Sequence, residues 1–156
     1  MRKPLPSEEY IIITDNKGRT RIESVEYVVL DVKGEDVYVT VEGLNYTEDS
    51  LYFKEQEFLI AVLDELTNIL EHPDLVIWDP LEPPNDTLIY YKQLYIAPLR
   101  KRKLVAAIVK SRNEIKFFYN LHLQDSGKVK GLTVVLPPDI EIWYIAPQVK
   151  RHHFGL

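Results

Sequence analysis

The feature that most constrains this chain is a series of apolar runs, rich in β-branched and aromatic residues, that fills its second half. Short polar or proline-containing segments separate five such runs: residues 87–96, 104–110, 115–123, 132–136 and 141–145. Runs of this kind between turn residues are typical of β-strands, and connections this short join antiparallel neighbours. The second half of the chain therefore predicts an antiparallel sheet.

One amphipathic helix precedes these strands. Between residues 55 and 71, apolar side chains recur at spacings of three and four, and charged or polar side chains occupy the opposite side. His72-Pro73 ends the helix, because the residue before a proline is pushed out of the helical region of backbone conformation. A short apolar run, residues 75–78, and a proline-rich loop follow.

The first third of the chain contains shorter strand-like runs. Residues 10–14, 25–32 and 37–41 are apolar and β-branched, and turn residues separate them at 15–18 and 33–36. Valines alternate with polar side chains in the last run, which is typical of a strand with one side in water. Residues 1–50 therefore predict an N-terminal β-meander.

The chain is long enough to form one core. It has 156 residues, of which 46% are hydrophobic, so it needs no disulfide or metal for stability. We expect a single domain, residues 1–156, with the β-meander in 1–50 and the helix and sheet in 51–156. The predicted fold class is α+β, with one long helix packed on a multi-stranded antiparallel sheet after the N-terminal β-meander.

The composition excludes several functional classes. The chain contains no cysteine, which excludes disulfide scaffolds, cysteine-ligated metal clusters and cysteine nucleophiles. It has only 6 glycines and no glycine-rich phosphate loop, and the adjacent His152 and His153 do not form a metal motif. We expect no cofactor and no metal. The apolar runs are too short for a membrane span or a signal peptide, so we expect no membrane association and a cytoplasmic location.

Charge is distributed unevenly along the chain. Residues 1–96 contain 8 basic and 20 acidic side chains, whereas residues 97–156 contain 11 basic and 4 acidic side chains. The densest basic segment is residues 100–116. Its basic residues form either solvated turns and a charged edge that resists aggregation, or a surface that positions phosphates. In the second case the phosphate-binding candidates are Arg100, Arg102, Lys110, Arg112 and Lys116.

Alternation along residues 115–123 predicts two different faces of a strand. The odd positions are apolar and suited to cover the helix, which leaves Lys116, Phe118, Asn120 and His122 together on the other face. On that face Lys116 holds a phosphate, Phe118 stacks on a base and His122 transfers a proton near neutral pH. An ordinary solvent-facing strand with an incidental histidine is the alternative.

Four short segments carry a resemblance to a known family: residues 69–73, 86–91, 104–109 and 115–119. Their order resembles that of the phage-encoded barnase, EndoU, colicin and RelE-like nucleases, over roughly residues 55–123. The resemblance implies a fold in which a helix ending in His-Pro precedes a four-stranded antiparallel sheet. It also implies metal-independent RNA cleavage, with His72 and basic residues of the sheet as candidates.

The sequence predicts a metal-independent ribonuclease of this toxin-like class, which cleaves RNA by attack of the 2′-hydroxyl on phosphorus. His122 and His72 are the expected catalytic residues, since the reaction needs an acid and a base. RNA and an antitoxin-like protein are the expected partners. The alternative is a non-catalytic α+β interaction module of a phage or mobile-element system that binds protein or nucleic acid.

Overall fold

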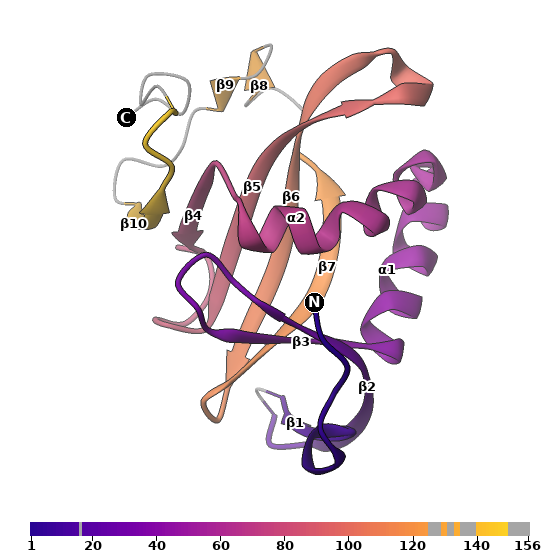
Figure 1. Ribbon diagram of the computed structural model, residues 1–156, viewed down its shortest axis with the longest axis vertical. Helices are drawn as coiled ribbons and strands as arrows, with labels where there is room; N and C mark the ends of the chain where they lie inside the picture. Colours follow the sequence, from indigo (N-terminus) through magenta and orange to yellow (C-terminus); the bar gives the residue numbers. More distant parts are fainter. Residues whose placement is uncertain (16, 125–128, 131–132, 135–139, 150–156) are drawn as a thin grey trace.

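The computed structural model describes residues 1–15, 17–124, 129–130, 133–134 and 140–149. Within these residues the main body is one eight-stranded sheet, with the strands in the order β1-β2-β3-β7-β6-β5-β4-β10. Two helical segments pack against this sheet: in Figure 1, α2 lies in front of the strands and α1 lies to the right, beside β7. A separate pair of short strands is formed by β8 (Val129–Lys130) and β9 (Thr133–Val134).

Most of the sheet is an antiparallel meander. It consists of β4 (Leu75–Trp78), β5 (Thr87–Ile96), β6 (Lys101–Arg112) and β7 (Ile115–Leu123), with β10 (Glu141–Ile145) on the outer side of β4. The strands predicted at 75–78, 87–96, 115–123 and 141–145 are confirmed, and β6 extends beyond the run at 104–110. The strand predicted at 132–136 lies largely outside the described residues.

The N-terminal strands form the predicted β-meander and then join the main sheet. β1 (Tyr10–Thr14), β2 (Thr20–Leu30) and β3 (Asp36–Thr40) are antiparallel neighbours. β3 runs parallel to β7, however, so the sheet is mixed and the prediction of an antiparallel sheet is wrong. Short connections impose an antiparallel arrangement only on consecutive strands, and helices and three strands separate β3 from β7.

The prediction of one long helix is also wrong. Residues 57–71 are divided into a 3-10 helix, η2 (Glu57–Glu65), and a short α-helix, α2 (Leu66–Glu71). A second helix, α1 (Val41–Phe53), begins inside the segment assigned to the β-meander. The Thr40 hydroxyl caps α1 by accepting a hydrogen bond from the Gly43 backbone N–H at 2.9 Å. Single 3-10 turns occur at η1 (Pro6–Glu8) and η3 (Ala97–Leu99).

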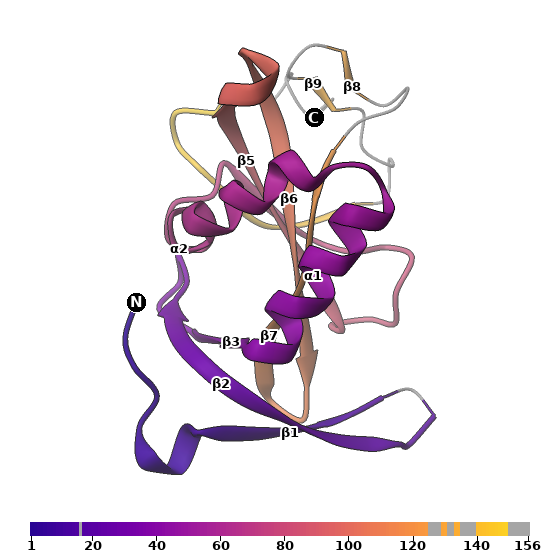
Figure 2. The same cartoon turned by 90° about the vertical axis from the view of Figure 1, so that its right-hand side faces the viewer.

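The two faces of the sheet carry different cores. The largest core lies under the helices, where Leu51 of α1, Leu59 of η2 and Leu66 of α2 pack with Tyr90 and Phe118 of the strands. A second cluster lies on the opposite face of β4 to β6, packed against residues of the β10 segment. A third lies between the β1–β2 hairpin and β7, where the hairpin passes below the ends of β6 and β7 (Figure 2).

Neither α1 nor α2, nor any 3-10 segment in the described part of the chain, has the length and apolar character needed to span a bilayer.

The β1–β2 hairpin, α1 and the end of the β6–β7 pair line the two hollows that form the candidate site.

Candidate functional site

A β-bulge at Tyr119 decides which side chains of β7 share a face. In the pairing of β6 with β7, Val109 lies opposite Phe118 and Ile108 lies opposite Asn120, so Tyr119 is an extra residue in β7. An extra residue reverses the alternation of side chains beyond it. Before the bulge, the side chains at even positions of β7 therefore face the helices. After the bulge, the side chains at odd positions face the helices and those at even positions face the opposite side of the sheet.

The prediction that Lys116, Phe118, Asn120 and His122 share one face of the strand is therefore wrong. Phe118 is fully buried in the core under the helices, where no base reaches it to stack. His122 lies opposite Ala106, whose neighbours belong to the cluster on the face away from the helices. Lys116 and His122 thus lie on opposite faces of the sheet.

Lys116 belongs to a cluster of charged side chains with two acids. Its Nζ lies 2.5 Å from Oδ2 of Asp31, whose side chain is fully buried, and 2.7 Å from Oε2 of Glu35. The Tyr90 hydroxyl donates to the same Asp31 oxygen at 2.7 Å. The Lys116 ammonium also lies 4.6 Å from the ring centroid of Trp143 in β10. Its charge is therefore compensated from several sides.

The other predicted residues are dispersed over the molecule. His72 ends α2 on the helix side of the sheet, with an exposed ring that is 3.9 Å from Glu71, so it does not meet His122. Arg100 and Arg102 are exposed at the start of β6. Arg102 is about 26 Å along the strand from Lys110. The basic segment is thus split between the two ends of β6.

Two predicted residues, Lys110 and Arg112, lie in a hollow that the sequence analysis did not identify. This cationic hollow has a volume of about 210 Å³ and also contains three basic side chains from the β1–β2 hairpin, Lys17, Arg19 and Arg21. Arg112 forms a largely buried ion pair with Asp86. The exposed ends of the other cations give this hollow its positive charge.

The hairpin turn is held in place by one acid. Asp15 accepts backbone hydrogen bonds from Lys17 and Arg19, each at 2.9 Å, and forms an ion pair with the Arg19 side chain at 2.8 Å. These contacts lower the pKa of Asp15 from its usual value, and the hydrogen bond from the Arg19 backbone N–H is the largest cause. The turn thereby presents Lys17 and Arg19 at one end of the cationic hollow.

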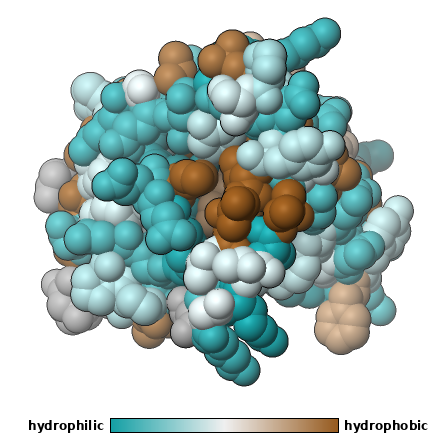
Figure 3. All heavy atoms as spheres, turned by 90° about the horizontal axis from the view of Figure 1, so that it is seen from below, coloured by the Kyte–Doolittle hydropathy of each residue, from teal (hydrophilic) through white to brown (hydrophobic). Residues whose placement is uncertain are grey.

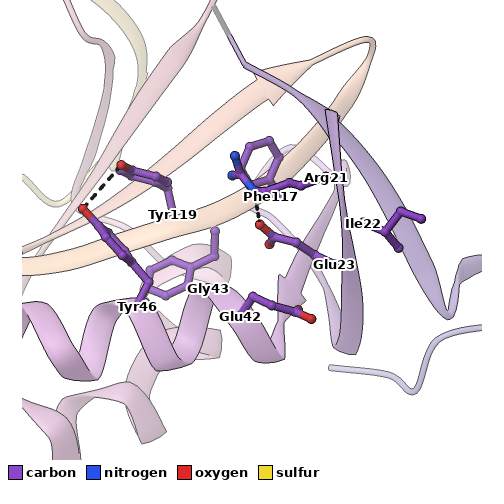
Figure 4. A pocket seen from close by; sticks show the side chains of 9 residues that line it. Arg21, Ile22, Glu23, Glu42, Gly43, Tyr46, Phe117 and Tyr119 are labelled. Carbon is purple, nitrogen blue, oxygen red and sulfur yellow. Dashed lines mark hydrogen bonds and ion pairs between the residues drawn. The ribbon is translucent and has the colours of Figure 1, made fainter. Parts of the chain in front are cut away.

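A second hollow of about 350 Å³ adjoins the first and shares Arg21, Phe117 and Tyr119 with it. This aromatic hollow is completed by Tyr46 of α1 and by two carboxylates, Glu23 and Glu42 (Figure 4). The cationic and aromatic hollows together are called the groove below.

Arg21 and Glu23 form the polar centre of the groove. They are two positions apart on β2 and therefore share a face. Arg21 Nε donates to Glu23 Oε2 at 2.5 Å, and the Thr40 hydroxyl donates to Glu23 Oε1 at 2.6 Å. The Glu23 side chain is 7% exposed, whereas that of Arg21 is 47% exposed. The Arg21 guanidinium therefore reaches toward the surface, and the Glu23 carboxylate with which it pairs is buried in the wall of the groove (Figure 4).

Two tyrosines form the other wall. The rings of Tyr46 and Tyr119 have centroids 5.2 Å apart and are tilted by 36°, and their hydroxyls are 3.4 Å apart. The hydrogen bond with Tyr119 and partial burial raise the pKa of Tyr46 from its usual value. Lys110 Nζ lies 4.5 Å from the centroid of the Tyr119 ring, so the aromatic wall and the cationic hollow meet at this side chain.

Sequence reasoning missed Arg21, Glu23, Tyr46 and Tyr119. Alternation on β2 puts the first pair on one face, but nothing local indicates that this face meets β7. Tyr46 was assigned to the β-meander, and Tyr119 to the apolar face that covers the helix. The close approach of the hairpin, α1 and β7 is a tertiary arrangement.

Compared with known proteins, the chain matches no family model, no curated protein and no solved structure. Among the described residues, no group of three or more histidine and acidic side chains is placed to hold a metal ion.

Proposed function

We propose that this protein is a metal-independent ribonuclease whose site is the groove. The observation that carries the proposal is the largely buried Glu23 carboxylate, held 2.5 Å from the exposed Arg21 guanidinium beside a cationic hollow. A carboxylate adjacent to phosphate-binding cations has the chemistry needed to cleave RNA.

Each role in the reaction has a candidate in the groove. Glu23 accepts the proton of the 2′-hydroxyl as its oxygen bonds to the adjacent phosphorus. Arg21 donates hydrogen bonds to the non-bridging oxygens, where negative charge develops. Lys110 gives a proton to the departing 5′ oxygen as the phosphorus–oxygen bond breaks. The products are a 2′,3′-cyclic phosphate and a free 5′-hydroxyl.

The arrangement of elements also supports the proposal. α2 ends at Glu71, directly before His72-Pro73, and is followed by β4, β5, β6 and β7, which are consecutive antiparallel strands. The resemblance to barnase, EndoU, colicin and RelE-like nucleases implies a helix before four antiparallel strands, and here the four strands are part of a larger mixed sheet. The groove lies at the β6–β7 end of that meander, and α1 and the β1–β2 hairpin complete it.

Incubation of labelled RNA with the purified protein in EDTA tests the proposal. We expect cleavage to a cyclic phosphate, and a fall of about 10²- to 10⁴-fold in rate in Glu23→Gln, the usual contribution of a general base. The matched control is Glu26→Gln, an exposed glutamate on the same strand, which should cleave at the wild-type rate.

Thermal unfolding of both variants shows whether the fold is retained. Undiminished cleavage by a folded Glu23→Gln variant removes Glu23 from the mechanism. A wild-type protein that cleaves none of several unrelated RNAs overturns the ribonuclease proposal.

A second candidate function is a non-catalytic interaction module, which the outer face of the β1–β2 hairpin favours. Tyr10, Ile12 and Ile22 are 59% to 66% exposed there, and Ile12 pairs with Ile22 across the two strands. Viewed from below, this side of the molecule has hydrophobic residues gathered near its centre and hydrophilic residues around them (Figure 3). A protein that binds a partner but is inert toward RNA would fit this candidate.

A further inference from the structure

We propose that Tyr46 and Tyr119 form a stacking site for one unpaired base, so that the groove takes single-stranded RNA and rejects fully paired RNA. The inference rests on the proposed function, because it assumes that the phosphates of the same RNA lie on the cationic hollow. It assigns a role to two residues that the cleavage chemistry does not use.

The two rings are arranged in advance of any ligand. Tyr46 is 48% exposed, and its contact with the Tyr119 hydroxyl at 3.4 Å holds it against the wall of the aromatic hollow. A ring held in this way loses little conformational entropy when a base stacks on it. The hollow, about 350 Å³, is within the size range of small-ligand sites.

The position of the rings is set by a close approach of α1 to β7. A Cβ atom on Gly43 would lie 2.9 Å from the Phe118 carbonyl oxygen and 3.0 Å from the Thr40 hydroxyl oxygen, so only glycine fits. Tyr46 is three positions further along α1 and therefore projects from a neighbouring part of the same helix face. The tight contact at Gly43 thereby brings the Tyr46 ring to the Tyr119 ring of β7.

The charges beside the rings match a nucleotide. Lys110 lies over Tyr119 at 4.5 Å, and Arg21 lines both hollows. A base stacked on Tyr46 therefore has cations next to its sugar and phosphate. In a duplex both faces of each base are covered by neighbours, so an unpaired strand reaches such a site without the cost of extruding a base.

Fluorescence anisotropy with labelled 2′-O-methyl RNA tests the inference, because this RNA lacks the attacking hydroxyl and is not cleaved. The probes are one strand of twelve residues and the same strand annealed to its complement. We expect tighter binding of the single strand. Tyr46→Ala should weaken that binding by about 10- to 100-fold, the usual effect of losing one stacked base.

Two further variants separate stacking from general effects. Tyr46→Phe keeps the ring and should bind the single strand within about threefold of wild type, since every base stacks on an aromatic face. Tyr52→Ala removes another exposed tyrosine of α1 that lies outside the groove, and it should bind like wild type. Stacking is uncharged, so the salt dependence of binding should be the same in Tyr46→Ala as in wild type.

Equal affinity for duplex and single strand, or unchanged affinity of Tyr46→Ala, overturns the inference. Its failure is distinguishable from that of the proposed function, because the probe reports binding alone. A protein that cleaves RNA but binds equally well without the Tyr46 ring refutes the stacking site only. A protein that binds as expected but cleaves nothing refutes the ribonuclease only.

Discussion

At the scale of single residues, the ion pair that each basic side chain forms, and how exposed that pair is, decides whether its charge is available to a ligand. Lys116 is paired with Asp31 and Glu35, and Arg112 is paired with Asp86. The pairs of Lys116 with Asp31 and of Arg112 with Asp86 are largely shielded from water, so their charges act within the fold, whereas Glu35 is half exposed. Arg21 also has a carboxylate partner, but nearly half of its side chain is exposed, and it faces the groove.

Lys116→Met should lower the free energy of unfolding by about 3 kcal/mol, the lower end of the usual cost of breaking a buried ion pair. The lower end applies because Asp31 keeps the Tyr90 hydroxyl and two backbone N–H donors. Urea denaturation measures the loss. The control is Lys101→Met at an exposed position of β6, which should change stability by less than about 0.5 kcal/mol. A Lys116→Met variant as stable as wild type would contradict the buried pair.

At the scale of elements, two local irregularities shape the groove. The bulge at Tyr119 lets Phe118 and Leu121, one at an even and one at an odd position, both pack in the core under the helices. α1 is packed through a stripe of small or apolar residues, Gly43, Thr47 and Leu51, that are spaced four apart. The low hydrophobicity of this stripe explains why periodicity did not predict the helix.

Gly43→Ala tests the close approach of α1 to β7. In a free helix this change is stabilising by up to about 1 kcal/mol, because alanine has the higher helix propensity. Here the added methyl group meets the Phe118 carbonyl oxygen, and overpacking typically costs about 1 to 3 kcal/mol. We therefore expect a net loss of unfolding free energy, measured by chemical denaturation. Asn45→Ala, exposed on the same helix, is the control and should be neutral or stabilising.

At the scale of the whole molecule, folding redistributes the charge. The acidic half of the sequence contributes Lys17, Arg19 and Arg21 to the cationic hollow, while β6 of the basic half contributes Lys110 and Arg112. Arg100 and Arg102 stay at the far end of β6. Clustering of basic residues in the sequence was therefore a poor guide to the positive surface.

The salt dependence of RNA binding should separate the two ends of β6. For a single strand, each neutralised phosphate contributes a slope of about −0.7 to the logarithm of affinity against the logarithm of salt. Lys110→Gln should therefore make the slope less negative by about 0.7, whereas Arg102→Gln should leave it unchanged. Titrations at several salt concentrations measure both slopes. Equal slopes for wild type and Lys110→Gln would remove Lys110 from the phosphate site.

The sequence by itself determined where most strands lie and how consecutive strands pair. Runs such as 87–96 and 115–123 are bounded by turn residues, and short connections leave antiparallel pairing as the geometry available to them. The predicted end of the helix at His72-Pro73 agrees with the end of α2 at Glu71, since proline restricts the backbone before it.

Tertiary structure alone decided the parallel contact of β3 with β7, the face on which each side chain of β7 lies, and the partners of its cations. A single extra residue at Tyr119 exchanges the two faces, and alternation in the sequence gives no sign of it. Likewise, Glu23 pairs with Arg21 because the two residues are two positions apart on one strand. The contact of the Tyr46 ring with the Tyr119 ring depends instead on how α1 packs on β7. Such contacts join residues far apart in the chain, and their energies depend on burial and packing that exist only once the whole sheet and its helices have assembled.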